Sequence, residues 1–566
     1  MDRIGKAVLF RVMRGDEVAM SKKIEKLKSG IQQQNNIVIW CVFLVAVMAA
    51  MWVYYTYLKK DLPNYPPMDE EIVALRAFDL FRGKNIVLNY FKYPSLSIYV
   101  GKGLFHLLNP IIAITETNYT YILRGAFTFF ALISYVFVFL GVKKLENSKG
   151  TALLSALFGI FSLFQFCFLY YVGPDLLMVF FANGLFLSAV YMFKCNDADK
   201  NMKCYIPIFC ILCGLAMSVK YNAVLAGILL VCVFCQKKYY KNIKYIYDTF
   251  RNLILIVLTF VVVNFSVFFH FETFIEDFKW NFTHYQTGHV GADCINPVME
   301  YTKLFFVGSY GFIGGILVIC GAAWLFYSKK YSEFIFLSIL PLITILIQGK
   351  YKIMFPRNNT LIMVYSYCFM SMSLPLFEKL LIRLKAKYKA DKGIPSACGY
   401  SIHVVIIFIN ICILLGYSNL KNNYLVESEN WINENIPVGS TIYLQTFADI
   451  YAPKLDQSKY NIIYNSDVFS IPENIDENVY VVFDSSNMER YLKREEGLLG
   501  YKANKYYEPD NRERYLAFVS KLELVHKIGE VAAPQWGSFE ILYTNLFRHL
   551  FDGSDVLWGW TNIYKL

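Results

Sequence analysis

Residues 37–57 read IVIWCVFLVAVMAAMWVYYTY and contain no charged side chain. A helix needs about 20 mostly apolar residues to cross a bilayer, so this stretch predicts a membrane span. It starts late and is long, which is untypical of a cleavable signal peptide. We expect further spans at residues 119–142, 151–171, 175–193, 252–271, 304–327, 332–348, 360–378 and 401–418.

The composition supports a membrane protein. Of 566 residues, 56% are hydrophobic, 17% aromatic and 17% charged, whereas a soluble domain has about 25% charged residues. A core of this size cannot bury so many apolar side chains, so lipid covers part of them. The net charge of +11 lies in short clusters between apolar runs. The chain has no motif that would bind in a groove of DNA or RNA, so this pattern argues against a nucleic-acid partner.

The basic clusters indicate the topology, because loops rich in Lys and Arg stay in the cytoplasm. Keeping the cluster at 22–28 on the same side as the later clusters requires that residues 93–108 do not cross. We interpret them as an interfacial or re-entrant segment. Residues 204–235 have basic flanks on both sides and break at Lys220, so they cross twice with Lys220 at the outer turn. The result is about 11 spans, with the N-terminus inside and the C-terminal segment outside.

This topology divides the chain into three parts. Residues 1–36 form a cytoplasmic segment, residues 37–419 a transmembrane module, and residues 420–566 a small extracytoplasmic α/β domain. The module has two long outer loops, 58–118 and 272–303. In the last part, β-rich runs predict strands. They are Thr441–Gln445, Tyr460–Tyr464, Val479–Phe483 and Phe539–Tyr543.

The first outer loop carries the most informative residues. Asp69, Glu70 and Glu71 precede an amphipathic helical run, Ile72–Arg82, which Gly83 ends. A carboxylate just outside the membrane could remove a proton from a hydroxyl or amine acceptor. Acidic residues also favour the first turn of a helix. The spacing alone leaves both interpretations open.

These motifs resemble those of the GT-C superfamily of membrane glycosyltransferases. Within it, the protein O-mannosyltransferase and aminoarabinose transferase group, which uses polyprenyl-phosphate sugars, is most similar. The resemblance rests on the order of several short motifs. They are Asp69-Glu70, Lys92-Tyr93-Pro94-Ser95-Leu96, Arg124, Val172-Gly173-Pro174-Asp175, Gly214-Leu215-Ala216 with Lys220-Tyr221-Asn222, Asn264, Gly288-His289-Val290-Gly291, Phe355-Pro356-Arg357-Asn358, and Trp431-Ile432-Asn433 with Pro437-Val438-Gly439-Ser440.

The resemblance implies a polytopic α-helical membrane protein of GT-C type with a small α/β domain after it. It also implies an inverting transfer of a sugar from a polyprenyl phosphate, such as undecaprenyl phosphate, to an acceptor on the outer side. Asp69 would be the general base, with Glu70 as its catalytic neighbour. The remaining site residues fall into two groups. Arg357, Lys220, Lys92 and Tyr93 would bind the donor phosphate or lipid, and Asp175, His289 and Arg124 would support the acceptor or the structure.

Simpler interpretations stand beside these. Lys220 and Arg357 could bind ordinary phospholipid headgroups, and Asp175 could only cap a helix. His289 could be an ordinary loop residue. Some relatives have Glu-Lys-Pro where this chain has Lys92-Tyr93-Pro94, which leaves the substrate open.

The resemblance predicts no firm cofactor. A divalent cation such as Mg²⁺ or Mn²⁺ at Asp69 would fit oligosaccharyltransferase relatives, but the sequence shows no second clear set of ligands. The expected partners are membrane lipids, a polyprenyl-phosphate sugar and an acceptor that is a protein, a glycan or a lipid. We expect a bacterial cytoplasmic membrane, with the active site facing the periplasm. The alternatives are a flippase for a lipid-linked sugar and a non-catalytic receptor.

Overall fold

The computed structural model describes most of the chain. The described residues are 37–56, 58, 68–84, 88–169, 172–195, 202–287, 296–387, 398–418, 424–445, 452–465, 478–484, 509–528 and 561–566. The chain divides into two compact units, Met1–Ala50 and Met51–Leu566. The described part of the first unit is helical and belongs to the apolar helix Ile37–Thr56.

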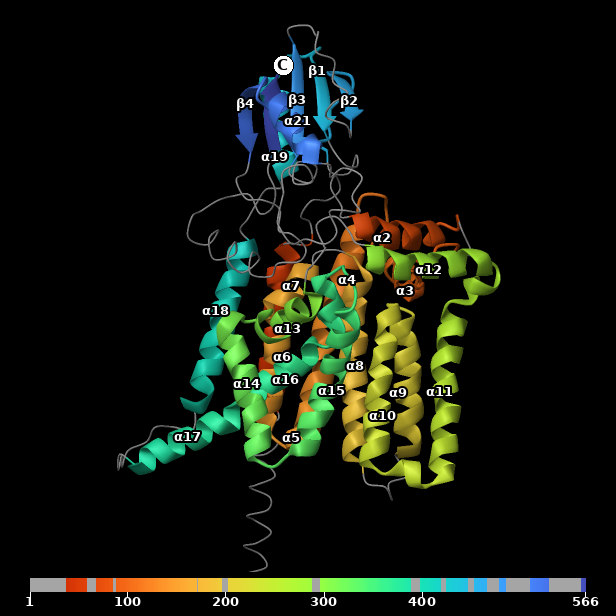
Figure 1. The fold of residues 1–566 in the computed structure, drawn as a ribbon, viewed down its shortest axis with the longest axis vertical. Coiled ribbons are helices and arrows are strands. Elements are labelled where there is room, and N and C mark those ends of the chain that lie inside the picture. The colour runs from red at the N-terminus through yellow and green to blue at the C-terminus, as the bar shows by residue number, and fades with distance from the viewer. Residues whose placement is uncertain are drawn as a thin grey trace, which may run out of the picture. The chain divides into compact units, whose positions relative to one another are not determined.

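Helices dominate the second unit up to residue 418 (Figure 1). They are α2 (Met68–Phe81), α3 (Leu96–Leu108), α4 (Tyr119–Ile133), α5 (Tyr135–Glu146), α6 (Lys149–Ile160), α7 (Leu163–Leu169), α8 (Pro174–Lys194), α9 (Met202–Met217), α10 (Gly227–Gln236), α11 (Ile243–Val263), α12 (Phe271–Thr287), α13 (Pro297–Val307), α14 (Gly311–Tyr327), α15 (Tyr331–Gln348), α16 (Met363–Met372), α17 (Leu374–Lys387) and α18 (Cys398–Ser418). Short 3₁₀ helices include η1 (Tyr221–Ala226), η3 (Phe265–Phe268) and η4 (Pro356–Leu361).

Several of these helices suit a membrane. Among the described residues, six are long and apolar enough to cross, and a seventh span would be α13 with α14, which meet at an angle of 86°. Shorter apolar helices add Leu96–Leu108, Cys204–Met217, Tyr221–Gln236 and Tyr400–Leu415. The break expected at Lys220 is present between α9 and η1. The count of about 11 spans remains a prediction.

Some expected boundaries were wrong. The span expected at 252–271 begins at Ile243, so part of the expected basic loop is helical. The continuous span expected at 304–327 is the bent pair α13–α14, and Gly311 at its bend has a φ of +60°. The span expected at 360–378 changes direction near Ser373, where α16 ends and α17 begins. Hydropathy detects apolar length, but not the local bends that packing imposes.

Two helices cross one end of the bundle (Figure 1). α2 coincides with the expected amphipathic run and ends before Gly83, whose φ of +77° suits glycine. It packs on α3 so closely that a Cβ on Gly101 would lie 2.8 Å from the Cβ of Ala77. α12 lies in the segment expected as the second outer loop, where no helix was expected, and the side of the membrane on which it lies remains a prediction.

Residues after 424 contain a separate α/β arrangement. Its described elements are α19 (Tyr424–Asn435), β1 (Thr441–Gln445), β2 (Asn461–Asn465), β3 (Val479–Asp484), α21 (Pro509–Val519), β4 (Glu523–Ile528) and β5 (Thr561–Lys565). The strands form a sheet in the order β2-β1-β3-β5-β4, in which β1 pairs in parallel with β2 and β3. Three expected strands are therefore confirmed, whereas β4 and β5 were not expected. The fourth expected strand, 539–543, lies outside the described residues.

Alternation along the strands explains the two faces of this sheet. Ile442 and Leu444 pack with Ile432 of α19, and Tyr443 packs with Phe483 and with Phe518 of α21. Successive side chains of a strand point to opposite faces. Each face therefore has its own buried cluster, covered by a helix.

Candidate functional site

A fully buried ion pair joins α2 to α4. The Nε and Nη2 atoms of Arg124 donate to the two carboxylate oxygens of Glu70 at 2.6 and 2.5 Å, and both side chains are 0% exposed. Nη1 of Arg124 donates to the carbonyl oxygen of Leu58 at 2.8 Å. This bidentate geometry is the strongest form of a carboxylate–guanidinium contact. Glu70 is thus held in place and fully desolvated.

The same carboxylate also reaches the start of α8. The backbone N–H of Val172 donates to Oε1 of Glu70 at 2.6 Å. Val172 precedes Gly173, Pro174 and Asp175, which open α8. The Glu70–Arg124 pair therefore ties together the segment after the first span, the first turn of α2, the middle of α4 and the start of α8. We call this arrangement the Glu70 hub.

The hub places the two predicted acidic residues in one region. Asp69 is adjacent to Glu70 in the first turn of α2, and Asp175 lies three residues beyond Val172. The side chain of Asp69 lies outside the described residues, as does all of His289. Their roles remain predictions.

Asp175 and Lys220 form a second ion pair. Nζ of Lys220 lies 2.7 Å from Oδ1 of Asp175, and their side chains are 12% and 2% exposed. The other carboxylate oxygen, Oδ2, is buried without a hydrogen-bond partner in the described structure. A nearby cation offsets part of the cost of burying a carboxylate. Lys220 supplies that cation.

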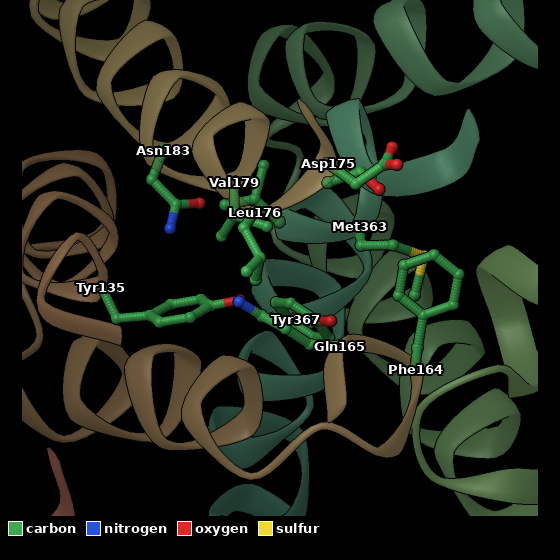
Figure 2. Close-up of a pocket in the computed structure, with 11 residues that line it drawn as sticks. Tyr135, Phe164, Gln165, Asp175, Leu176, Val179, Asn183, Met363 and Tyr367 are labelled. Carbon is green, nitrogen blue, oxygen red and sulfur yellow. The ribbon is translucent and has the colours of Figure 1, made fainter. Parts of the chain in front are cut away.

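A small cavity lies below Asp175 in the bundle (Figure 2). The cavity has a volume of about 10 Å³, which is room for about one water molecule. Its lining mixes apolar and polar side chains. They are Tyr135, Phe164, Gln165, Asp175, Leu176, Val179, Asn183, Thr360, Met363, Val364 and Tyr367. A sugar does not fit this space, so the cavity is no donor site in the described arrangement.

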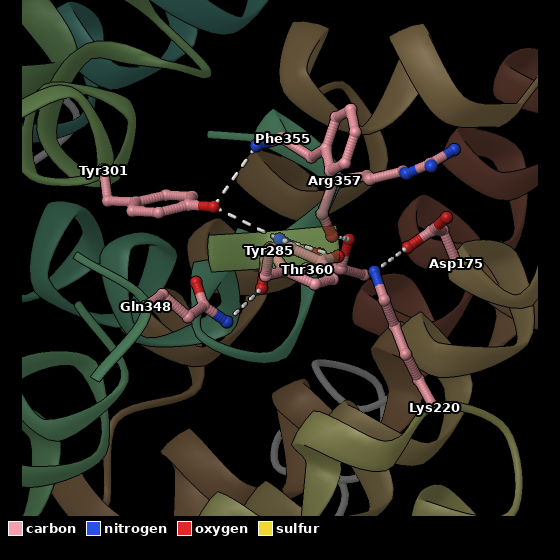
Figure 3. Close-up of polar contacts among 9 residues, drawn as sticks. Asp175, Lys220, Tyr285, Tyr301, Gln348, Phe355, Arg357 and Thr360 are labelled. Carbon is pink, nitrogen blue, oxygen red and sulfur yellow. Dashed lines mark hydrogen bonds and ion pairs between the residues drawn. The ribbon is translucent and has the colours of Figure 1, made fainter. Parts of the chain in front are cut away.

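Arg357 lies on the turn that packs against α8. This turn, η4, contributes Thr360 to the cavity that Asp175 also lines. Residues three apart in a 3₁₀ helix lie on the same side, so Arg357 is on the side of η4 that faces this region. Figure 3 shows Arg357 and the Asp175–Lys220 pair in the same close-up. The guanidinium carbon also lies 4.9 Å from the centroid of the Phe355 ring.

Hydrogen bonds to α13 hold the Phe355–Asn359 turn in place. The hydroxyl oxygen of Tyr301 accepts hydrogen bonds from the Phe355 backbone N–H at 3.2 Å and from Nδ2 of Asn358 at 3.1 Å (Figure 3). Nδ2 of Asn359 donates to the Tyr301 carbonyl at 3.0 Å, and Nε2 of Gln348 donates to the Asn358 carbonyl at 3.3 Å. These contacts set the direction in which Arg357 leaves the turn.

Lys92 lies in a second fixed segment. The Phe91 N–H donates to Oδ2 of Asp277 on α12 at 2.7 Å, and the hydroxyl of Tyr221 donates to the Phe91 carbonyl at 2.7 Å. Nδ2 of Asn281 donates to the Lys92 carbonyl at 3.1 Å. The Lys92 ammonium lies 4.1 Å from the centroid of the Trp280 ring, within reach of a cation–π interaction.

Asn264 holds the other end of this segment. Its Oδ1 accepts from the Ser95 N–H at 2.8 Å, and its Nδ2 donates to Oγ of Ser218 at 3.0 Å. The Leu96 N–H donates to the Ser218 carbonyl at 3.0 Å. All of these groups lie at the α9–α11 end of the bundle that bears Lys220. The segment with Lys92 and Tyr93 is therefore fastened to the elements that present Lys220.

Sequence reasoning found some of these residues and missed others. Arg124 was expected to support the site, and the Glu70 hub gives it a definite contact. Asp277 and Tyr301 were missed. Asp277 lies in α12, within an expected loop, and a tyrosine hydroxyl that holds a backbone turn has no signature in sequence.

The described residues do not fit a metal centre. They contain no group of three or more His, Cys, Asp or Glu side chains arranged to hold a metal. Asp175 has one unpartnered oxygen, but Lys220 occupies the other. A single carboxylate beside an ammonium is a poor ligand set for a divalent cation.

The chain matches no protein-family model and no curated protein. Solved structures are similar to it in fold. Archaeal oligosaccharyltransferase AglB from Archaeoglobus fulgidus, in complex with an inhibitory peptide and a dolichol-phosphate, is 12% identical, with coverage of 94% of this chain and 88% of that chain and a TM-score of 0.49. ArnT from Cupriavidus metallidurans, bound to undecaprenyl phosphate, is 13% identical, with coverage of 93% and 98% and a TM-score of 0.47.

A third similar structure is the protein O-mannosyltransferase Pmt1-Pmt2 complex of S. cerevisiae. It is 13% identical, with coverage of 46% of this chain and 36% of that chain and a TM-score of 0.28. At these identities and TM-scores the similarities transfer no activity to this chain. The structures that it resembles are glycosyltransferases of the GT-C superfamily, the group that its motifs resemble.

Proposed function

We propose that this protein is a membrane glycosyltransferase that moves a sugar from a polyprenyl-phosphate carrier to an acceptor outside the cytoplasm, with inversion. The observation that carries the proposal is the Glu70 hub. It binds the helix that bears Asp69 to the segment that opens into Asp175. A base candidate and a cation-bearing region thereby share one end of the bundle.

Asp69 is the proposed general base. Its carboxylate takes the proton from the acceptor hydroxyl or amine, while the acceptor atom forms a bond to the anomeric carbon. Glu70 is unsuited to this task, because both of its oxygens already accept hydrogen bonds from Arg124 and it has no exposed surface. We therefore assign Glu70 a positioning role.

The leaving group is the polyprenyl phosphate. The bond between the anomeric carbon and the phosphate oxygen breaks, and its electron pair stays on the phosphate. This anion needs no general acid, but it needs nearby positive charge. Arg357 and Lys220 supply it in the proposal, since both lie near the start of α8. Lys220 would exchange part of its contact with Asp175 for the phosphate.

Lys92 and Tyr93 are proposed to complete the lipid-phosphate site from the other side. The Asp277, Tyr221 and Asn264 contacts hold their segment in one conformation. Holding a loop in its bound shape lowers the entropic cost of binding. The acceptor approaches Asp69 from the aqueous side, and Asp175 supports this region.

The test is a transfer assay with the full chain in lipid nanodiscs. Native mass spectrometry first shows which polyprenyl phosphates the purified protein retains. The retained carrier, loaded with its sugar, is then supplied with envelope extracts, and glycosylated products are measured. Donor-dependent product excludes the flippase alternative. Transport of the carrier across the bilayer without any product would instead support the flippase and contradict the proposal.

A further inference from the structure

A group of basic and aromatic side chains meets where α14 packs against α17. Nζ of Lys379 lies 4.4 Å from the centroid of the Tyr327 ring and 6.0 Å from that of Trp324. Nη2 of Arg383 donates to the Tyr327 hydroxyl oxygen at 3.1 Å. Ser328 follows directly at the end of α14. We call these five residues the α14–α17 cluster.

Within the described ranges, two cations thus converge on one tyrosine without a neutralising acid. In the described part of the chain, neither Lys379 nor Arg383 has a carboxylate partner. Glu378, the adjacent acid, acts electrostatically on Tyr400 instead. Like charges four residues apart on a helix repel each other and destabilise it. The pair would be stabilised by an anion that both cations contact.

Two other basic residues near the ends of the helices are paired with internal carboxylates. Lys330, just beyond α14, lies 2.5 Å from Glu146, and Lys194 lies 2.7 Å from Glu333. Among the described residues, Lys379 and Arg383 have no such carboxylate, and they differ from these two lysines in converging on one aromatic side chain. A negative charge at this place can come from outside the chain.

Two further donors in the cluster are unused. The indole Nε1 of Trp324 and the hydroxyl oxygen of Ser328 are buried without a hydrogen-bond partner in the described structure. A buried donor left without a hydrogen-bond partner is unfavourable, because it has lost its contacts with water. An oxygen-rich anion at this position could accept hydrogen bonds from these groups as well as from the two cations.

The surroundings indicate a lipid rather than a soluble anion. α17 leaves the bundle sideways at the end opposite α2 and α12 (Figure 1). Apolar side chains around the cluster are exposed: Phe326 by 49%, Tyr327 by 53% and Leu380 by 43%. Amphipathic helices with basic and apolar residues lie in the membrane interface, where Trp and Tyr also concentrate. A free anion would make no use of this apolar rim, whereas acyl chains would.

We propose that the α14–α17 cluster binds the headgroup phosphate of an anionic phospholipid in the adjacent leaflet. Lys379 and Arg383 neutralise the phosphate, and the Trp324 N–H donates to it. The acyl chains lie against Leu380 and Phe326. This site is separate from the proposed donor site and does not depend on the proposed function.

The experiment uses the full chain in nanodiscs with equal amounts of phosphatidylglycerol and phosphatidylcholine. After release, native mass spectrometry measures the phosphatidylglycerol that each protein retains. The double variant Lys379→Gln/Arg383→Gln should retain at least about tenfold less, because a direct hydrogen bond between a charged side chain and the phosphate contributes about 1.5–3 kcal/mol. The matched control Lys241→Gln/Lys244→Gln removes the same charge at the α10–α11 turn and should retain as much as the unchanged protein.

Trp324→Phe keeps both charges and removes only the indole donor. It should lower retention by less than the double variant, and it serves as the test if the double variant fails to fold. Three results would overturn the proposal: unchanged retention in both α14–α17 variants, equal loss in the Lys241/Lys244 control, or complete displacement of the lipid by millimolar inorganic phosphate. The last result would indicate a site for a free anion.

Discussion

Arg124 and Glu70, 54 residues apart, form a bidentate ion pair with no exposed surface, and the same carboxylate accepts the N–H of Val172. Such a pair is not by itself a sign of high stability, since burying two charges offsets much of their attraction. Its main consequence is that it holds two helices in place. It fixes the first turn of α2, and with it Asp69, against the start of α8.

Breaking this pair should destabilise the protein strongly. Arg124→Met leaves the Glu70 carboxylate buried without its cation, a loss of about 3–5 kcal/mol. Thermal unfolding in nanodiscs measures the effect. The exposed pair Arg82–Glu116 provides the control, because Arg82→Met should cost less than about 1 kcal/mol. Similar losses for both variants would contradict the role of the hub.

Asp69→Asn should abolish transfer with little effect on folding. Removal of a general base lowers the rate by about 10²–10⁴-fold. Glu71→Gln is the matched control, since it changes a neighbouring acid and should leave the rate within about threefold of normal. Transfer rates in the nanodisc assay and retained polyprenyl phosphate by mass spectrometry separate catalysis from binding. Normal turnover of the Asp69→Asn protein would show that Asp69 is not the general base.

Arg357→Ala should weaken donor binding more than it slows the chemical step. A hydrogen bond to a charged group contributes about 1.5–3 kcal/mol, which corresponds to about a 10- to 100-fold higher donor KM. Lys350→Ala is the control, since Lys350 is an exposed cation just before the same turn. An unchanged KM for the Arg357 variant would exclude its contact with the phosphate.

Asn264→Leu should loosen the segment that carries Lys92. The change removes the acceptor for the Ser95 N–H and the donor to Ser218. Each buried group left unpaired costs about 1–3 kcal/mol. Hydrogen exchange should rise at residues 91–96. Asn252→Leu, on the same helix, loses a bond to the Asp248 carbonyl and should not change exchange in that segment.

Tyr460→Phe tests the α/β domain. The Tyr460 hydroxyl donates to the carbonyls of Ile432 and Ile436 at 3.2 and 3.3 Å, so its loss should speed hydrogen exchange in α19. Tyr443→Phe is the control, a buried tyrosine of the same sheet.

The same tyrosine predicts a pH dependence. Burial raises the pKa of Tyr460 above its ordinary value of 10.0. The folded domain then binds this proton more tightly than the unfolded chain does. Its stability contribution is complete below pH 10 and is lost as the pH rises through the folded pKa. Hydrogen exchange in α19 should therefore accelerate above pH 10, and this acceleration should be smaller in Tyr460→Phe.

The sequence was informative wherever a signal is local. Apolar runs of about 20 residues predicted the long helices, and the amphipathic run after Asp69 predicted α2 closely. Runs rich in β-forming residues predicted β1, β2 and β3. The sequence was a poor guide where tertiary packing determines the secondary structure. The amphipathic α12 was taken for a loop, because a helix lying across the end of a bundle has no long apolar run to reveal it.

For the candidate site, the sequence alone determined which residue types are available and their order along the chain. Only the tertiary structure decided their partners. It paired Glu70 with Arg124, joined Asp175 to Lys220, and placed Asp277 and Tyr301 behind the segments with Lys92 and Arg357. The physical reason is that a charge or a hydroxyl acts through its distance to other groups and its loss of water. Both quantities depend on contacts between residues far apart in the chain, which no local pattern encodes.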